Sequence, residues 1–157
     1  LSYQYYDKKH LFRMGGEQES YDAGNKKITI EYKNWKLNPF ICYDLRFPVW
    51  CRNTNNAEVM VFVSNWPEVR KEHWLSLIKA RAIENQCFVL GSNRVGIDGN
   101  GVSHSGNSIV VSPKGDIIQE LVHEEGVIKL SLGGNEVAAY RKKFPAFLDS
   151  DEFEIKG

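Results

Sequence analysis

The sequence predicts a layered α/β fold, and three observations lead to that prediction. The continuous apolar run Val-Met-Val-Phe-Val at 59–63 is typical of a strand buried on both faces. Residues 68–86 repeat apolar side chains with a helical period, and a second buried strand follows at 87–91. Pro113-Lys114-Gly115-Asp116 is a hairpin turn sequence between two later strands. Strands and a helix alternate before that hairpin, which favours an α/β arrangement.

Two strands and a short helix are expected ahead of this central part. Polar and apolar residues alternate over 26–32, as in a half-buried strand, and a second strand is expected over 35–41. Pro39 lies inside the second strand and removes a ladder hydrogen bond, which indicates an edge or a bulge. Pro48 suits the first turn of a helix that we expect to run towards Asn53.

The later part of the chain is expected to be mostly sheet. The hairpin strands are predicted at 108–112 and 117–121, and a final strand at 126–132. The segment 98–101, Asp-Gly-Asn-Gly, has the composition of a turn, and no other hard ligands cluster with it to favour a metal. No repeat or low-complexity stretch divides the chain, so one compact unit is predicted.

Composition excludes several classes of partner. Twenty basic and twenty acidic residues give a net charge of zero, which provides no electrostatic footprint for nucleic acid or an anionic membrane. No apolar run approaches the roughly 20 residues that cross a bilayer. Three widely spaced cysteines fit a reducing compartment better than a disulfide framework. We expect a cytoplasmic protein with no metal or cofactor.

Cys42 is the sharpest candidate for chemistry. It follows a predicted strand and precedes a predicted helix, in the sequence Ile-Cys-Tyr-Asp-Leu-Arg-Phe-Pro at 41–48. A strand–turn–helix junction projects a side chain from the strand end and directs backbone N–H groups at it. Such groups stabilise a thiolate or an oxyanion. The alternative is a buried structural cysteine, which is the commoner fate of a lone cysteine.

The partner of this cysteine is less obvious. The chain has four histidines, and none lies in a recognisable cysteine-protease signature. Lys8, in the sequence Tyr-Asp-Lys-Lys-His-Leu-Phe at 6–12, is another candidate. A lysine beside a thiolate donates to a developing oxyanion, and a neighbouring carboxylate keeps it charged. The alternative for Lys8 is an ordinary solvated lysine.

Several ordered segments together resemble the motifs of the nitrilase superfamily of carbon–nitrogen hydrolases, over nearly the whole chain. These segments are 6–12, 41–48, 65–67, 73–74, 80–86, 106–108, 112–115 and 140–145. Within the superfamily the sequence is most similar to the omega-amidase, or 2-oxoglutaramate amidase, branch. The features that point to this branch are Arg13-Met14, the segment 46–50 and the segment 143–147.

The resemblance implies the C-terminal part of the family's four-layer αββα sandwich, with residues 1–157 forming the C-terminal portion of one domain. The family's first glutamate, its general base, lies well before the lysine motif, so we expect it to precede Leu1. Without that N-terminal half, a large apolar sheet face is expected to be uncovered. The implied reaction is hydrolysis of the terminal amide of 2-oxo acids, with release of ammonia.

The resemblance also implies roles for single residues. Cys42 matches the nucleophile and Lys8 the lysine, whose ammonium would form the oxyanion hole with the Tyr43 backbone N–H. Glu17 best matches the second glutamate, and Glu19 is the alternative. The implied partners are a small-molecule amide and a second copy of the chain in a homodimer or higher oligomer.

The expected substrate pocket rests on Arg46, Asn65 and Trp66. Asn65 and Trp66 follow a buried strand and are expected at the same sheet edge as the nucleophile. Arg46 is expected to bind the substrate's carboxylate; its alternative is pairing with Asp44 or Glu84. Trp66 has the alternative of being plain core. For function, the alternatives are a nitrilase or N-carbamoyl amidase of the same fold, or an inactive fragment that serves only as an assembly module.

Overall fold

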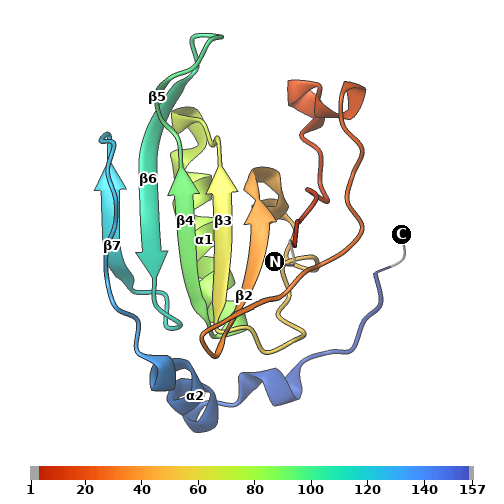
Figure 1. The fold of residues 1–157 in the computed structure, drawn as a ribbon, viewed down its shortest axis with the longest axis vertical. Helices are drawn as coiled ribbons and strands as arrows, with labels where there is room; N and C mark the ends of the chain where they lie inside the picture. Colours follow the sequence, from red (N-terminus) through yellow and green to blue (C-terminus); the bar gives the residue numbers. More distant parts are fainter. Residues whose placement is uncertain (1–3, 156–157) are drawn as a thin grey trace.

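The computed structural model describes residues 4–155, which form one mixed sheet with a long helix on one face (Figure 1). The strands are β1 (Ile30–Tyr32), β2 (Trp35–Ile41), β3 (Val59–Ser64), β4 (Phe88–Asn93), β5 (Val95–Ile97), β6 (Ser103–Val111) and β7 (Ile117–Val122). Their order is β1-β2-β3-β4-β6-β5, and β7 pairs with β6. The helices are α1 (Lys71–Asn85) and α2 (Gly134–Lys143), and the 3-10 helices include η1 (Arg13–Gly15), η2 (Glu17–Glu19) and η3 (Cys42–Arg46).

The three central strands β2, β3 and β4 are parallel, and the others join antiparallel. Parallel strands place their carboxyl ends at one edge of a sheet, so the residues after β2 and β3 meet there (Figure 1). Helix α1 makes the crossover from β3 to β4. The α/β class expected from the sequence is therefore confirmed, and it brings Cys42 and Asn65 to the same edge.

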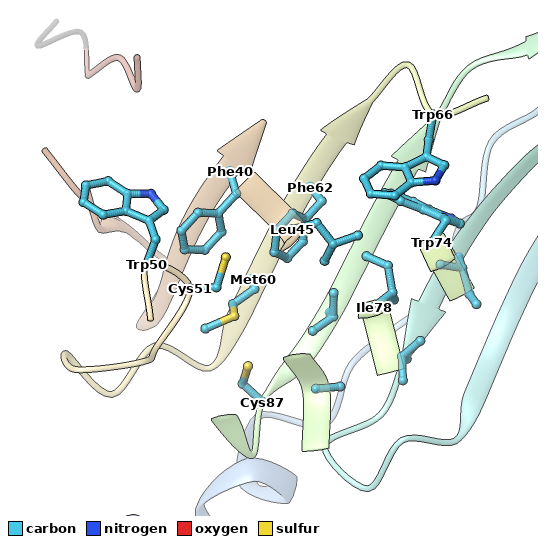
Figure 2. Packing of buried hydrophobic residues seen from close by; sticks show 14 residues of the cluster. Phe40, Leu45, Trp50, Cys51, Met60, Phe62, Trp66, Trp74, Ile78 and Cys87 are labelled. Atoms are coloured by element: carbon cyan, nitrogen blue, oxygen red, sulfur yellow. The ribbon is translucent and has the colours of Figure 1, made fainter. Parts of the chain in front are cut away.

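The main core lies between the sheet and α1 (Figure 2). Alternate side chains of the central strands, such as Phe40 and Phe62, face α1, from which Trp74 and Ile78 project. A methyl group on Gly91 would lie 2.6 Å from the Trp74 ring, so only glycine admits the indole here. Each fully buried large side chain contributes about 1.5–3 kcal/mol. This core makes the sheet edge a rigid platform.

The opposite face of the sheet is covered only in part. At one end, Val137 of α2 packs against Val59 and Phe88. Along the same strand, Val61 is half-buried and Val63 is 50% exposed. The expectation that β3 is buried on both faces is therefore wrong for its second half, because α2 does not extend over it.

Arg141 fastens α2 to the end of α1. Its guanidinium donates to the backbone carbonyls of Gln86, Ala57 and Asn85, at 3.1, 2.7 and 3.3 Å. The last carbonyls of a helix lack partners within the helix, and an arginine is well suited to several of them at once. Arg141 therefore couples the C-terminal segment to the core.

Two expected elements are shorter in the structure. Strand β1 begins at Ile30 rather than residue 26, because its register with β2 would place Ile28 opposite Pro39, which has no N–H. The helix expected from Pro48 towards Asn53 is absent: a 3-10 helix ends at Arg46 and a turn follows it. One turn forms past Pro48, with the Cys51 N–H donating to the Phe47 carbonyl, but the Asn53 N–H donates to the Asn85 side chain at 2.9 Å and not to a helical carbonyl.

The C-terminal third departs most from the prediction. The segment 126–132 is not a strand; Val127 is 88% exposed and no neighbouring strand pairs with it among residues 4–155. Strand β5 and helix α2 were not predicted, since both are short and carry few buried residues. The helix predicted at 68–86 is confirmed as η4 (Glu68–Arg70) followed by α1. Within residues 4–155, no helix is both long and apolar enough to cross a membrane.

Candidate active site

Cys42 is the first residue of η3 and directly follows β2. Its φ is +46°, in the left-handed region that a residue with a side chain seldom adopts. Strain of this kind costs on the order of 1–3 kcal/mol and is concentrated at functional sites. The sharp turn at the strand end that the sequence predicts is therefore present, although the helix after it is a single short 3-10 helix.

Several groups act on the Cys42 thiol. Burial raises the pKa of the thiol. The backbone N–H of Asn65, the positive charge of Lys8 and the hydroxyl of Ser64 pull that pKa down, while the negative charge of Glu17 raises it. Residues that follow β2, residues at the end of β3 and residues of the N-terminal segment thus all influence the pKa of this one thiol.

Lys8 and Glu17 form an ion pair beside this thiol. The ammonium lies 2.7 and 2.5 Å from the two carboxylate oxygens, and the Phe12 backbone N–H donates to the same carboxylate at 2.7 Å. Burial alone would raise the pKa of Glu17, but the hydrogen bonds from Lys8 and Phe12 and the lysine's charge leave it below its ordinary value. Glu19, the alternative to Glu17, is exposed. The lysine side chain is only 12% exposed, so it is not an ordinary solvated lysine.

The structure adds a buried carboxylate that the sequence analysis did not single out as functional. Asp44, two residues after the cysteine, is fully buried and accepts hydrogen bonds from Tyr6, His10 and the Ile41 backbone. The Trp50 indole N–H donates in turn to the Tyr6 hydroxyl at 2.8 Å. The spacing of Tyr6, Lys8 and His10, each two residues apart, is the one sequence signal that pointed to this network.

Arg46 pairs with neither Asp44 nor Glu84, the alternatives considered from the sequence. Its guanidinium lies 4.9 Å from the centre of the Trp66 ring, and one of its nitrogens lies 3.0 Å from Nδ1 of His73. Arginine has no acceptor, so His73 accepts through an unprotonated Nδ1. Arg46 is half-buried, and no carboxylate among residues 4–155 pairs with it, which leaves its charge available for an anion.

Trp66 belongs to the core and also supports Arg46. It is 3% exposed, its indole N–H donates to the Arg70 carbonyl, and its ring packs on Trp74. The side chain of Asn93 binds both the backbone N–H and the carbonyl of Trp66, at 2.7 and 3.2 Å. Asn65, the residue before it, is exposed. The turn that carries Asn65 is thus fixed by Asn93 from the neighbouring strand.

The other cysteines are not available for chemistry. Cys51 and Cys87 are fully buried, and burial raises the pKa of each thiol to about 12. Within residues 4–155, His, Cys, Asp and Glu side chains do not gather in threes as metal ligands would. The arrangement of Cys42, Lys8 and Glu17 can therefore support nucleophilic attack by sulfur, with an ammonium and the Tyr43 backbone N–H near the nucleophile to stabilise an oxyanion.

Comparisons with known proteins identify a family that the chain resembles. A family model described as carbon–nitrogen hydrolase matches residues 3–142. The omega-amidase YafV of Escherichia coli K12 is 48% identical over 152 residues, which cover 96% of this chain and 59% of that protein. The 2-oxoglutaramate amidase of Bacillus subtilis is 38% identical over 146 residues, which cover 92% of this chain and 56% of that protein.

A solved structure matches the fold closely. The crystal structure of a carbon–nitrogen hydrolase superfamily protein from Xanthomonas campestris, with an arsenic adduct in its active site, gives a TM-score of 0.95 at 43% identity. The match covers 98% of this chain and 61% of that one. The chain therefore spans about three fifths of the length of these relatives.

Proposed function

The chain belongs to the carbon–nitrogen hydrolase family, and from that premise we propose that it hydrolyses the terminal amide of 2-oxo acids, such as 2-oxoglutaramate. The substrate class rests on the similarity to an omega-amidase and to a 2-oxoglutaramate amidase. The observation that carries the proposal is the meeting of a strained cysteine with a lysine–glutamate pair, which is suited to acyl transfer through sulfur.

The proposed reaction proceeds through a thioester on Cys42. The sulfur attacks the amide carbon, and the Lys8 ammonium and the Tyr43 backbone N–H stabilise the oxyanion. The C–N bond breaks as the nitrogen receives the thiol proton through a general base, and ammonia leaves. Water then hydrolyses the thioester to a carboxylate and restores the thiol. Glu17 keeps Lys8 charged and in place throughout.

Arg46 is the proposed site for the carboxylate at the other end of the substrate. Its planar guanidinium suits a bidentate carboxylate, and stacking on Trp66 while binding His73 limits its freedom. Asn65 would lie along the acyl chain, because it follows β3 at the same sheet edge as Cys42 and its backbone N–H lowers the pKa of the thiol. Trp66 would contribute indirectly, because its ring packs against the Arg46 guanidinium and holds it in place.

We also propose that residues 1–157 are the C-terminal portion of a larger four-layer αββα domain, whose general-base glutamate lies outside this sequence. Two observations support this: the relatives are longer than the chain, and Val63 is 50% exposed on an open sheet face. A second copy of the protein is a further proposed partner, through the C-terminal segment, where Phe144 and Leu148 are 57% and 72% exposed. Sedimentation velocity of the protein would measure its oligomeric state.

The test is ammonia release from 2-oxoglutaramate by the intact protein, whose N-terminus has been read by mass spectrometry, beside the variant Cys42→Ala. Loss of all turnover in the folded variant supports the cysteine amidase. Release of ammonia from nitriles but not from 2-oxoglutaramate would favour a nitrilase, and release of carbon dioxide from N-carbamoyl compounds an N-carbamoyl amidase. If the intact protein hydrolyses neither 2-oxoglutaramate, nitriles nor N-carbamoyl compounds, the result would favour a protein that serves only as an assembly module.

A further inference from the structure

We propose that Asp44 is a positioning residue that holds Lys8 beside the Cys42 thiol, by binding Tyr6 and His10 on either side of that lysine. The proposal concerns how the site is assembled, and its link to catalysis rests on the proposed function.

Four hydrogen-bond donors converge on the Asp44 carboxylate, which is fully buried. On Oδ2 they are the Tyr6 hydroxyl at 2.7 Å and the Ile41 backbone N–H at 3.1 Å. On Oδ1 they are the His10 backbone N–H at 3.0 Å and the His10 ring Nδ1 at 2.8 Å. A carboxylate has room for about four donors, so the acceptor capacity of Asp44 is filled.

These donors come from two segments that are distant in sequence. Ile41 belongs to the strand that delivers Cys42, whereas Tyr6 and His10 belong to the N-terminal segment that delivers Lys8. Lys8 lies two residues from each anchor, which is at most about 7 Å of extended chain. One carboxylate therefore fixes the lysine segment at both sides of Lys8 and ties it to the cysteine turn.

Further contacts make the two anchors rigid. The Trp50 indole N–H donates to the Tyr6 hydroxyl, and the His10 ring stacks on Phe47 with centroids 3.6 Å apart and an angle of 6°. The carbonyl of Lys8 itself accepts from the Gly24 N–H at 2.8 Å. Because its backbone is held from both sides, Lys8 needs only its side-chain torsions to reach Glu17 and act on the thiol.

The variant Asp44→Asn separates this role from a direct electrostatic one. Asparagine keeps one acceptor oxygen but presents an NH₂ group on the other side, so the backbone N–H of Ile41 or of His10 faces a second donor and loses its hydrogen bond. Removing a negative charge would by itself make the thiolate easier to form. Displacing the Lys8 charge makes it harder to form. The two effects have opposite signs, so the direction of the change identifies its cause.

The experiment measures the rate of Cys42 alkylation by iodoacetamide against pH in the intact protein, with Asp44→Asn, Lys8→Met and the double variant. Besides Lys8 and Glu17, the groups that face the thiol are the Asn65 N–H and the Ser64 hydroxyl, and all four remain in Asp44→Asn. The proposal predicts that both single variants move the profile to higher pH and that the double variant matches Lys8→Met. The alkylation rate is measured without an amide substrate, so its result does not depend on whether the proposed reaction is correct.

A matched control and a conservative pair complete the test. Asp98 also accepts two backbone N–H groups and contacts a histidine. It lies between β5 and β6, and β5 is at the opposite end of the strand order from β2, which precedes Asp44. Asp98→Asn should therefore leave the alkylation profile unchanged. If Asp44→Asn does not fold, His10→Phe keeps the ring stacking without the ring donor, and His10→Asn restores a donor near Nδ1. The proposal predicts a shift for His10→Phe and a near-normal profile for His10→Asn.

An alkylation profile of folded Asp44→Asn that is unchanged or that moves to lower pH would overturn the proposal. Fully additive shifts in the double variant, or equal profiles for the two His10 variants, would also overturn it. In the amidase assay, Asp44→Asn should lower kcat about 10²-fold, as expected for a misplaced catalytic group, with little change in KM. An inactive wild-type protein whose alkylation profiles behave as predicted would refute the proposed function and leave the role of Asp44 intact.

Discussion

Replacing Lys8 with methionine tests whether the lysine–glutamate pair is a structural part of the site. Methionine keeps the length and apolar character of the lysine stem but removes the ammonium that binds both Glu17 oxygens. A hydrogen bond to a charged group is worth about 1.5–3 kcal/mol. Because Glu17 is 31% exposed and gains water in the variant, we reduce the expected loss of stability to about 1–2 kcal/mol.

The pH dependence of this loss follows from Glu17. Its pKa in the folded protein lies below the ordinary value of 4.5, so its ionisation stabilises the fold above that pH. The stabilisation is lost as the pH falls through the lowered pKa. The difference in unfolding free energy between wild type and Lys8→Met should therefore be full at pH 7 and should shrink below about pH 4.5.

Urea unfolding followed by tryptophan fluorescence measures this difference. At pH 7 the midpoint of Lys8→Met should lie about 0.5–1 M below that of wild type. Lys9→Met is the control, because Lys9 lies over the Trp50 ring rather than on Glu17, and its effect should not depend on the ionisation of Glu17. A difference for Lys8→Met that stays constant or grows in acid would refute the reasoning.

Three further predictions follow from the same structure. Arg141→Lys should lower the unfolding free energy by about 2 kcal/mol in urea titrations, because lysine cannot bind three separate backbone carbonyls at once as the guanidinium does. Equal stability would contradict the role of the guanidinium. At pH 8 an aromatic disulfide reagent should label Cys42 alone in the native protein, and in urea it should label Cys51 and Cys87 as well. Rapid labelling of all three thiols in the native protein would contradict the burial of Cys51 and Cys87. Arg46→Met should lower kcat/KM for 2-oxoglutaramate about 10–100-fold but leave kcat/KM for amides without a carboxylate unchanged. An equal loss of kcat/KM for both kinds of substrate would assign Arg46 a structural role.

Much of the fold was predictable because its signals are local. The helical period of α1 arises from the face that it buries, and the apolar run of β3 indicates a central strand, although Val63 is 50% exposed. The succession of strands and helix then places Cys42 and Asn65 at one sheet edge. The error after Pro48 has a different cause. The expected helix stops after one turn, because the Asn53 N–H donates to the Asn85 side chain and not to a helical carbonyl.

The candidate site was predictable only as separate motifs. Nothing in the spacing of residues 8 and 17 requires an ion pair, and the choice between Glu17 and Glu19 depended on how two short 3-10 helices turn the chain. The Asp44 network was not foreseen, because its partners are 34 and 38 residues away along the chain. Long-range polar contacts of this kind leave no periodic pattern in a sequence.

The central claim is that Cys42 is an acylated nucleophile held beside Lys8 and Glu17. The most direct measurement is rapid acid quenching of the intact protein during turnover of 2-oxoglutaramate, followed by mass spectrometry of the cysteine-containing peptides. The account predicts a thioester mass on the peptide that carries Cys42, and none on the peptides that carry Cys51 or Cys87. Ammonia release without such an adduct, and with activity retained in Cys42→Ala, would contradict it.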